Sequence, residues 1–196
     1  MNYIYPIASK ISTNDKSKLM NQHPKLIWMT GLSGSGKSTL ALQFEYFLFT
    51  QKFKTFLLDG DTVRNGLNKD LGFSDDDRKE NLRRIAEVSK LMIDSGLIVI
   101  SAFISPFKAE RELIKEIVGA ENFVEVFVDC PLEECEKRDV KGLYDKARKG
   151  MIKNFTGIDS PYEKPENPDI YLKTNEQDVS SCLDILVQKI VPTLSI

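Results

Sequence analysis

One motif in this sequence fixes both a local backbone shape and the kind of ligand that shape can hold. Residues 31–38 read GLSGSGKS and match the pattern G-x-x-x-x-G-K-[ST]. An apolar run at 25–30 precedes the motif, and apolar residues at helical spacing follow it. A strand, a glycine-rich loop and a helix in this order form a phosphate-binding loop, whose backbone amides and helix N-terminus face the phosphates of a nucleoside triphosphate.

The side chains of this loop have separate expected roles. Lys37 supplies a cation to the β- and γ-phosphates of ATP, and the Ser38 hydroxyl is a candidate ligand for Mg²⁺. An accidental glycine-rich turn would lack the flanking strand and helix. The motif therefore predicts triphosphate binding, although it does not specify the reaction. The predicted nucleotide-binding residues are Gly31, Leu32, Ser33, Gly34, Ser35, Gly36, Lys37, Ser38 and Thr39.

Strand and helix patterns alternate along the rest of the chain. The expected strands are 25–30, 55–58, 97–104, 123–128 and 170–172, and the expected helices are 37–52, 74–95, 107–118, one from Pro131, and 178–190. Ser74 fits an N-cap, and the inward face of its helix is expected at Ile85, Val88, Leu91 and Met92. This alternation predicts an α/β protein of the P-loop NTPase type, a three-layer α/β/α sandwich with a mostly parallel sheet.

The domain organisation follows from composition along the chain. Residues 1–24 are polar and lack periodicity, so we expect a loose N-terminal arm there and a kinase-type domain over 25–196. Within that domain, residues 140–168 carry three glycines, three prolines and many charges. We expect this segment to be a mobile lid, because long loops inside a compact domain are usually functional.

Charge and cysteine content restrict the classes of partner. The formal net charge is −2, so no overall basic field attracts nucleic acid. The sequence has no apolar run near the roughly 20 residues of a membrane span and no secretory signal pattern, so we expect no membrane partner and a cytoplasmic location. Cys130, Cys135 and Cys182 are expected to be reduced structural thiols. A zinc site would need further ligands, and His23 is the only histidine.

A second group of polar residues follows the strand expected at 55–58. Asp59-Gly60-Asp61 comes directly after it, and ligands of parallel sheets bind beyond the carboxyl ends of the strands. We expect Asp61 to hold Mg²⁺ or to act on a hydroxyl nucleophile, and Arg64 to bind an anionic acceptor. Taken alone, each could instead be a solvated loop charge.

Long ordered matches over residues 25–175 narrow the function. They are GLSGSGKST at 31–39, LDGD at 58–61 with Arg64, GLNKDLGFS at 66–74, DRKENLRRIAEV at 77–88, FISP at 103–106, FVDCPLEECEKRDVKGLYDKARKG at 127–150 and FTGIDSPYEKP at 155–165. In these segments the chain resembles the adenylyl-sulfate kinase family. The resemblance implies a homodimeric enzyme of sulfate assimilation that converts ATP and adenylyl sulfate to ADP and 3′-phosphoadenylyl sulfate with Mg²⁺.

The resemblance also implies a set of site residues. Arg138 matches a position on the ATP side, and Phe73 and Phe155 are expected to sandwich the acceptor adenine, although a lone Phe is often only core. Lys37, Asp61 and Ser105 are the expected catalytic residues. The residues expected around adenylyl sulfate are Asp61, Arg64, Phe73, Arg78, Asn81, Ile104, Ser105, Lys141 and Phe155.

Ser105 has two alternative roles. It follows a buried strand, so we expect its hydroxyl to face the site. In some descriptions of the family this serine is a phosphorylated intermediate; in the alternative it only hydrogen-bonds the acceptor. We favour direct in-line transfer, which needs positioning and charge neutralisation more than covalent help. Phe107-Lys108 stand where the family usually has Tyr-Arg, so this chain lacks the hydroxyl and the planar guanidinium fork of that pair.

Two other functions compete with this interpretation. The first is a kinase of the same fold that acts on a related nucleotide acceptor. The second is a catalytically dead regulator that only binds nucleotide. The presence of Lys37, Ser38 and Asp61 argues against the regulator, whereas ATP binding without turnover would support it.

Overall fold

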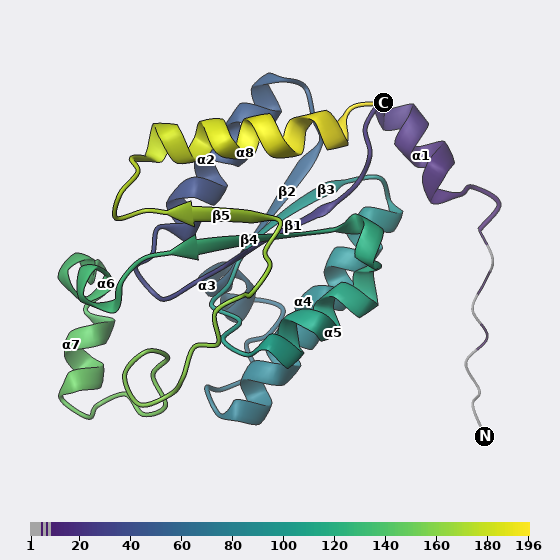
Figure 1. The fold of residues 1–196 in the computed structure, drawn as a ribbon. Helices are drawn as coiled ribbons and strands as arrows, with labels where there is room; N and C mark the ends of the chain where they lie inside the picture. The colour runs from purple at the N-terminus through teal and green to yellow at the C-terminus, as the bar shows by residue number, and fades with distance from the viewer. Residues whose placement is uncertain (1–4, 6, 8) are drawn as a thin grey trace.

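The computed structural model describes residues 5, 7 and 9–196 and contains one five-stranded sheet. The strand order is β2-β3-β1-β4-β5, and every pair of neighbouring strands is parallel (Figure 1). This confirms the α/β class with a parallel sheet. The strands are β1 (Leu26–Thr30), β2 (Thr55–Asp59), β3 (Ile98–Ala102), β4 (Phe123–Asp129) and β5 (Ile170–Lys173).

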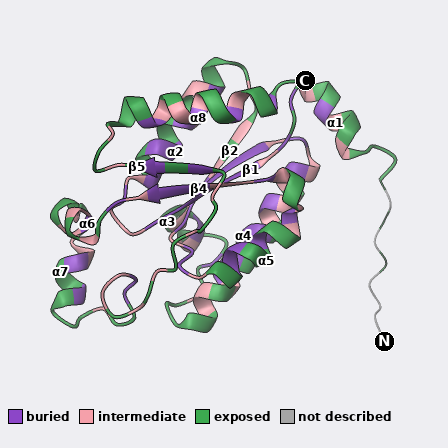
Figure 2. Ribbon diagram, viewed as in Figure 1, coloured by how far each residue is buried: buried purple, intermediate pink, exposed green. Residues whose placement is uncertain are grey.

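Helices cover both faces of the sheet and bury two separate apolar cores. The first core lies between the sheet and helices α2 (Lys37–Thr50) and α8 (Val179–Leu194), and the second lies between the sheet and α4 (Asp75–Asp94) and α5 (Lys108–Val118). Figure 2 shows buried residues along the central strands β1 and β4 and exposed residues on the outer faces of these helices. The short helices are α1 (Thr13–Met20), α3 (Gly60–Asn65), α6 (Leu132–Arg138), α7 (Leu143–Arg148) and the 3-10 turn η1 (Ala120–Asn122).

The strand register brings the carboxyl ends of the strands to one edge. Thr30, the last residue of β1, pairs with Phe127 of β4, and Ala102 of β3 pairs with both Met29 and Asp59. The loops after β1, β2, β3 and β4 therefore begin close together. This edge faces α6 and α7 in Figure 1.

The expectation of a loose arm is wrong for the residues around α1. Ser12 caps this helix, since its Oγ accepts from the amide of Asp15 at 3.1 Å. Gln22 is fully buried and its Nε2 donates to the carbonyls of Lys54 (3.0 Å) and Gly96 (2.8 Å). Capping and distant hydrogen bonds order this segment, and neither produces hydrophobic periodicity. Residues 1–4, 6 and 8, which belong to the same prediction, lie outside the described residues.

Helix α4 begins after Ser74 as expected, because the Ser74 side chain accepts from the amide of Asp77. Its inward face differs from the expectation, since Leu91 is 71% exposed whereas Ile85 is fully buried. The buried positions follow the 3.6-residue period through Leu82, Ile85, Ala86, Ser89 and Ile93, and Val88 and Met92 are only partly buried.

The lid segment, residues 140–168, contains more regular structure than its composition indicates. It includes α7, and its Tyr144 and Phe155 are buried. Its mobility stays a prediction. Among the helices of the described residues, none is long and apolar enough to cross a membrane.

Candidate active site

The loop after β1 has a backbone that requires glycine. Gly31 lies so close to β4 that a Cβ there would be 2.4 Å from the carbonyl oxygen of Val128. Gly34 has a φ of +74°, and a Cβ there would be 3.0 Å from the carbonyl of Cys135. Gly36 precedes α2 and makes no side-chain cap, so the first amides of α2 are left for an anion.

Lys37 is turned back onto this loop. Its Nζ donates to the carbonyls of Gly31 (2.8 Å) and Leu32 (2.7 Å), and the residue is 8% exposed. Burial lowers the pKa of Lys37 to about 8. A buried ammonium whose close partners are neutral carbonyls favours an incoming anion, which would supply the counter-charge that these carbonyls lack.

Asp59 is a site residue that the sequence pattern places beside Asp61 but to which no separate role was assigned. The Ser38 hydroxyl donates to Oδ2 of Asp59 at 3.1 Å, and Oδ1 of Asp59 accepts from the amide of Asp61 at 3.0 Å. Asp61 itself makes an ion pair with Lys141 of the lid segment. The carboxylate in contact with the expected magnesium ligand is therefore Asp59. Its place as the last residue of β2 was the available signal.

The donor set is compatible with Mg²⁺ held partly by phosphates. The described residues contain no group of three His, Cys, Asp or Glu side chains that could hold a metal ion on their own. Ser38, Asp59 and Asp61 offer one hydroxyl and two carboxylates next to the phosphate loop. Mg²⁺ in nucleotide sites commonly takes one or two carboxylates and completes its shell with phosphate oxygens and waters.

Arg64 of α3 and Arg78 of α4 together concentrate positive charge near the start of α4. Arg64 donates from Nη1 to the carbonyl of Gly72 (2.7 Å), and Arg78 donates from Nε to the carbonyl of Phe73 (3.0 Å). The Arg64 guanidinium lies 4.5 Å from the centre of the Phe73 ring. Burial and then the nearby charge of Arg78 lower the pKa of Arg64. An anionic ligand would relieve this repulsion.

The two aromatic rings expected to sandwich an adenine are in different environments. Phe73 is 68% exposed, whereas Phe155 is 8% exposed and packs edge-on against Tyr144 with ring centres 5.0 Å apart. No aromatic contact joins Phe73 to Phe155 among the described residues. In this structure Phe155 is a core residue of the lid segment, and the sandwich stays a prediction.

Two other predicted residues make contacts within the site. Asn81 is buried, and its Oδ1 accepts from Nδ2 of Asn68 at 2.9 Å. Arg138 donates to the carbonyl of Thr174 at 2.7 Å and lies 3.4 Å from the carbonyl of Gly34. Thr174 is a site residue that the sequence analysis missed, and its Oγ1 donates to the carbonyl of Ser35 at 2.8 Å. Arg138 and Thr174 thus border the phosphate loop on one side.

Ser105 is 2% exposed, and the expectation that its hydroxyl faces the site stays a prediction. Its Oγ accepts from Nε1 of Trp28 at 3.0 Å and donates to Oγ1 of Thr30 at 3.0 Å. The indole can only donate, and Thr30 in turn donates to the carbonyl of Ile104 at 2.7 Å. The single proton of the Ser105 hydroxyl is therefore already committed to Thr30.

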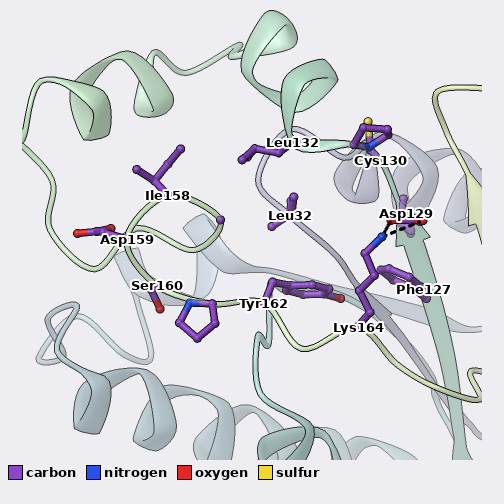
Figure 3. Close-up of a pocket in the computed structure, with 14 residues that line it drawn as sticks. Leu32, Phe127, Asp129, Cys130, Leu132, Ile158, Asp159, Ser160, Tyr162 and Lys164 are labelled. Atoms are coloured by element: carbon purple, nitrogen blue, oxygen red, sulfur yellow. Dashed lines mark hydrogen bonds and ion pairs between the residues drawn. The ribbon is translucent and has the colours of Figure 1, made fainter.

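A cavity of about 550 Å³ lies between the phosphate loop and the lid segment (Figure 3). The end of β4, the start of α6 and residues 157–164 line it, and Leu32 is the one predicted site residue among the residues described at its wall. Tyr162 in this wall shares a hydrogen bond with Thr30 at 2.9 Å, and Tyr144 donates to the carbonyl of Ser33 at 2.8 Å. The lid segment is thus bonded directly to the phosphate loop.

Comparisons with known proteins agree on one family. The family model described as adenylylsulphate kinase matches residues 23–173. The adenylyl-sulfate kinase of Marinobacter nauticus is 57% identical over 91% of this chain and 89% of its own length, and that of Bacteroides thetaiotaomicron is 53% identical over 98% and 96%. A solved structure of the Mycobacterium tuberculosis APS kinase CysC in complex with AMPPNP and APS has a TM-score of 0.78 at 47% identity, and the match covers 84% of this chain and 98% of that one.

Proposed function

The chain belongs to the adenylyl-sulfate kinase family, and from this premise we propose that it transfers the γ-phosphate of ATP to the 3′-hydroxyl of adenylyl sulfate, releasing ADP. The observation that carries the proposal is the placement of two positive groups at one sheet edge. Lys37 and the phosphate loop lie after β1, and the Arg64–Arg78 pair lies beyond β2. A triphosphate donor and an anionic acceptor each find a cationic site there.

On the ATP side, the phosphate loop binds and orients the donor. The uncapped amides of α2 hold the phosphates, and Lys37 leaves the carbonyls of Gly31 and Leu32 to reach them. Arg138, bonded to Thr174 beside the loop, borders the space for the rest of the nucleotide. The contact between Gly34 and Arg138 supports this assignment.

Mg²⁺ would be held at the hydroxyl of Ser38, with Asp59 and Asp61 next to it. When bound, the ion neutralises charge on the transferring phosphoryl group. Asp59 accepts a hydrogen bond from the Ser38 hydroxyl and caps α3, which fixes the position of Asp61. In this structure the Asp61 carboxylate is paired with Lys141 of the lid segment.

On the acceptor side, the two arginines would bind the phosphosulfate or phosphate oxygens, because planar guanidinium groups match such oxygens in pairs. Lys141 would leave Asp61 for the same anion when the lid segment closes over it. Asp61, released from this pair, accepts the proton of the 3′-hydroxyl as the new P–O bond forms. Asn81, held by Asn68, remains a candidate contact for the nucleoside.

Direct in-line transfer fits the surroundings of Ser105 better than a phosphoserine route. A covalent route needs the Ser105 oxygen to attack the γ-phosphate, yet this oxygen is buried and bonded to Trp28 and Thr30. The roles left for this serine are to hold the turn that carries it and to contact the acceptor.

A homodimer and a cytoplasmic location complete the proposal, and both come from the resemblance and the composition. Light scattering of the purified protein after size-exclusion chromatography measures the oligomeric state, and a mass of one chain would contradict the dimer.

The function is tested by ADP release from ATP and Mg²⁺ with and without adenylyl sulfate, followed by a panel of other nucleotide acceptors. We expect rapid ADP release only with adenylyl sulfate, with 3′-phosphoadenylyl sulfate as the product. A higher kcat/KM for another acceptor, or ATP binding with no turnover on any acceptor, would contradict the proposal.

A further inference from the structure

A buried arginine joins three segments of the chain. One of them is the acceptor turn, which we define as residues 104–106. Arg111 of α5 is 4% exposed. Its Nη1 donates to the carbonyl of Ser105 at 2.8 Å, and its Nη2 donates to the carbonyl of Glu163 at 2.7 Å. Its Nε pairs with Oε1 of Glu125 on β4 at 2.9 Å. Each nitrogen of the guanidinium thus holds a different segment, which the planar fork of arginine permits.

The backbone of the acceptor turn needs such support. Ser105 has a φ of +38°, in the left-handed region that residues with a side chain disfavour. A conformation of this kind persists only where the surroundings hold it, and it occurs often at functional sites. Trp28 and Thr30 hold the hydroxyl of Ser105, whereas Arg111 holds its carbonyl. The direction of the turn therefore depends on both sets of bonds.

The same arginine also fixes the end of the lid segment. The amide of Glu163 donates to the carbonyl of Pro106 at 2.8 Å, and the Glu163 carboxylate accepts from the amide of Lys108 at 2.7 Å. Next to it, Tyr162 lies with its ring 5.9 Å from the Arg111 guanidinium and lines the cavity in Figure 3. Arg111 is thus at the centre of a joint between the acceptor turn and the lid segment.

Arg111 does not itself face a ligand. Its charge is balanced by Glu125, it is buried, and it is not among the residues at the wall of the cavity. None of its hydrogen bonds reaches the phosphate loop at 31–39. Any effect of Arg111 on catalysis must therefore act through the acceptor turn and the lid segment.

We propose that Arg111 is a positioning residue for the acceptor nucleotide, which sets the acceptor turn and the end of the lid segment relative to each other. This proposal rests on the function proposed above. The guanidinium of Arg111 holds these two segments and does not contact the phosphate loop. Loss of this guanidinium therefore affects the binding of adenylyl sulfate and leaves ATP binding close to that of the wild type.

The experiment compares Arg111→Lys with Arg83→Lys, the same chemical change at an exposed arginine of α4 that pairs with Glu80. Steady-state ADP release gives kcat and the KM of each substrate. For Arg111→Lys we expect the KM for adenylyl sulfate to rise about tenfold, the factor that corresponds to loss of roughly one buried hydrogen bond. The KM for ATP stays within about twofold in both variants, and Arg83→Lys behaves as wild type.

A second variant separates positioning from stability. Arg111→Met combined with Glu125→Met removes both members of the buried pair, so no uncompensated charge remains and the melting temperature stays near that of wild type. We expect this folded variant to show the same selective rise in the KM for adenylyl sulfate, because it also lacks the bonds to Ser105 and Glu163.

An unchanged KM for adenylyl sulfate in the folded double variant overturns the proposal, as does an equal rise of both KM values in Arg111→Lys. Failure of the proposed function gives a different result. In that case the wild-type protein releases no ADP in response to adenylyl sulfate, which is seen before any variant is measured.

Discussion

ATP binding should take up a proton at alkaline pH, because Lys37 is partly neutral in the free protein. Burial lowers the pKa of this lysine to about 8 from an ordinary value of 10.5. Contact with a triphosphate restores the charged form. From this pKa we expect an uptake of about 0.1 proton at pH 7, about 0.5 at pH 8 and about 0.9 at pH 9.

The assay is calorimetric titration of a non-hydrolysable ATP analogue with Mg²⁺ in buffers of different ionisation enthalpy. The dependence of the observed heat on buffer enthalpy gives the number of protons taken up. Lys37→Met should take up none at pH 8, whereas Lys115→Met, a change at an exposed lysine of α5, should behave as wild type. Equal uptake by Lys37→Met and wild type would refute the reasoning, and so would no uptake by wild type at pH 9.

The same pKa shift predicts an effect on folding. The folded protein binds fewer protons at Lys37 than the unfolded chain between pH 8 and 10.5, so the free energy of unfolding rises with pH across this window. Below pH 8 the full cost of burying the charge is present, at most about 3 kcal/mol for this shift. Lys37→Met should therefore stabilise the ligand-free protein at pH 7 while it abolishes turnover. Urea unfolding at pH 7 and pH 10 measures the difference.

Three further substitutions test the acceptor and the mechanism. Arg78→Ala should raise the KM for adenylyl sulfate more than the KM for ATP, because Arg78 lies beside Phe73. A rise in the KM for ATP alone would show that Arg78 contacts ATP and not the acceptor. Asp61→Asn should lower kcat by roughly 10²–10⁴-fold, as expected for loss of a general base or a metal-positioning carboxylate, and a kcat near wild type would remove Asp61 from both roles. Ser105→Ala should lower kcat only about fivefold to tenfold, as for one lost hydrogen bond, whereas an inactive variant together with a competent phosphoserine in the wild type would establish the covalent route.

The local parts of this protein could be predicted from the sequence alone. The loop at 31–38 has a fixed spacing and a strand and helix beside it, so its conformation depends on residues that are near in sequence. The alternation of strands and helices gave the parallel sheet, and the helix start at Ser74 followed from local capping. Of the two carboxylates at the end of β2 and just beyond it, however, Asp59 and not Asp61 contacts Ser38, since only the placement of β2 relative to α2 decides this.

Contacts between distant segments were decided by the tertiary structure. Trp28 and Ser105 are bonded across 77 positions of the chain, and Arg111 and Glu163 across 52. No periodicity marks such pairs, because each depends on where two separate elements end once the sheet has formed. The burial of Ser105, the ordering of Gln22 and the central place of Arg111 all arise in this way. The sequence determined the phosphate loop and the sheet edge on which it lies, whereas packing around that edge decided which side chains are held and which remain open to a ligand.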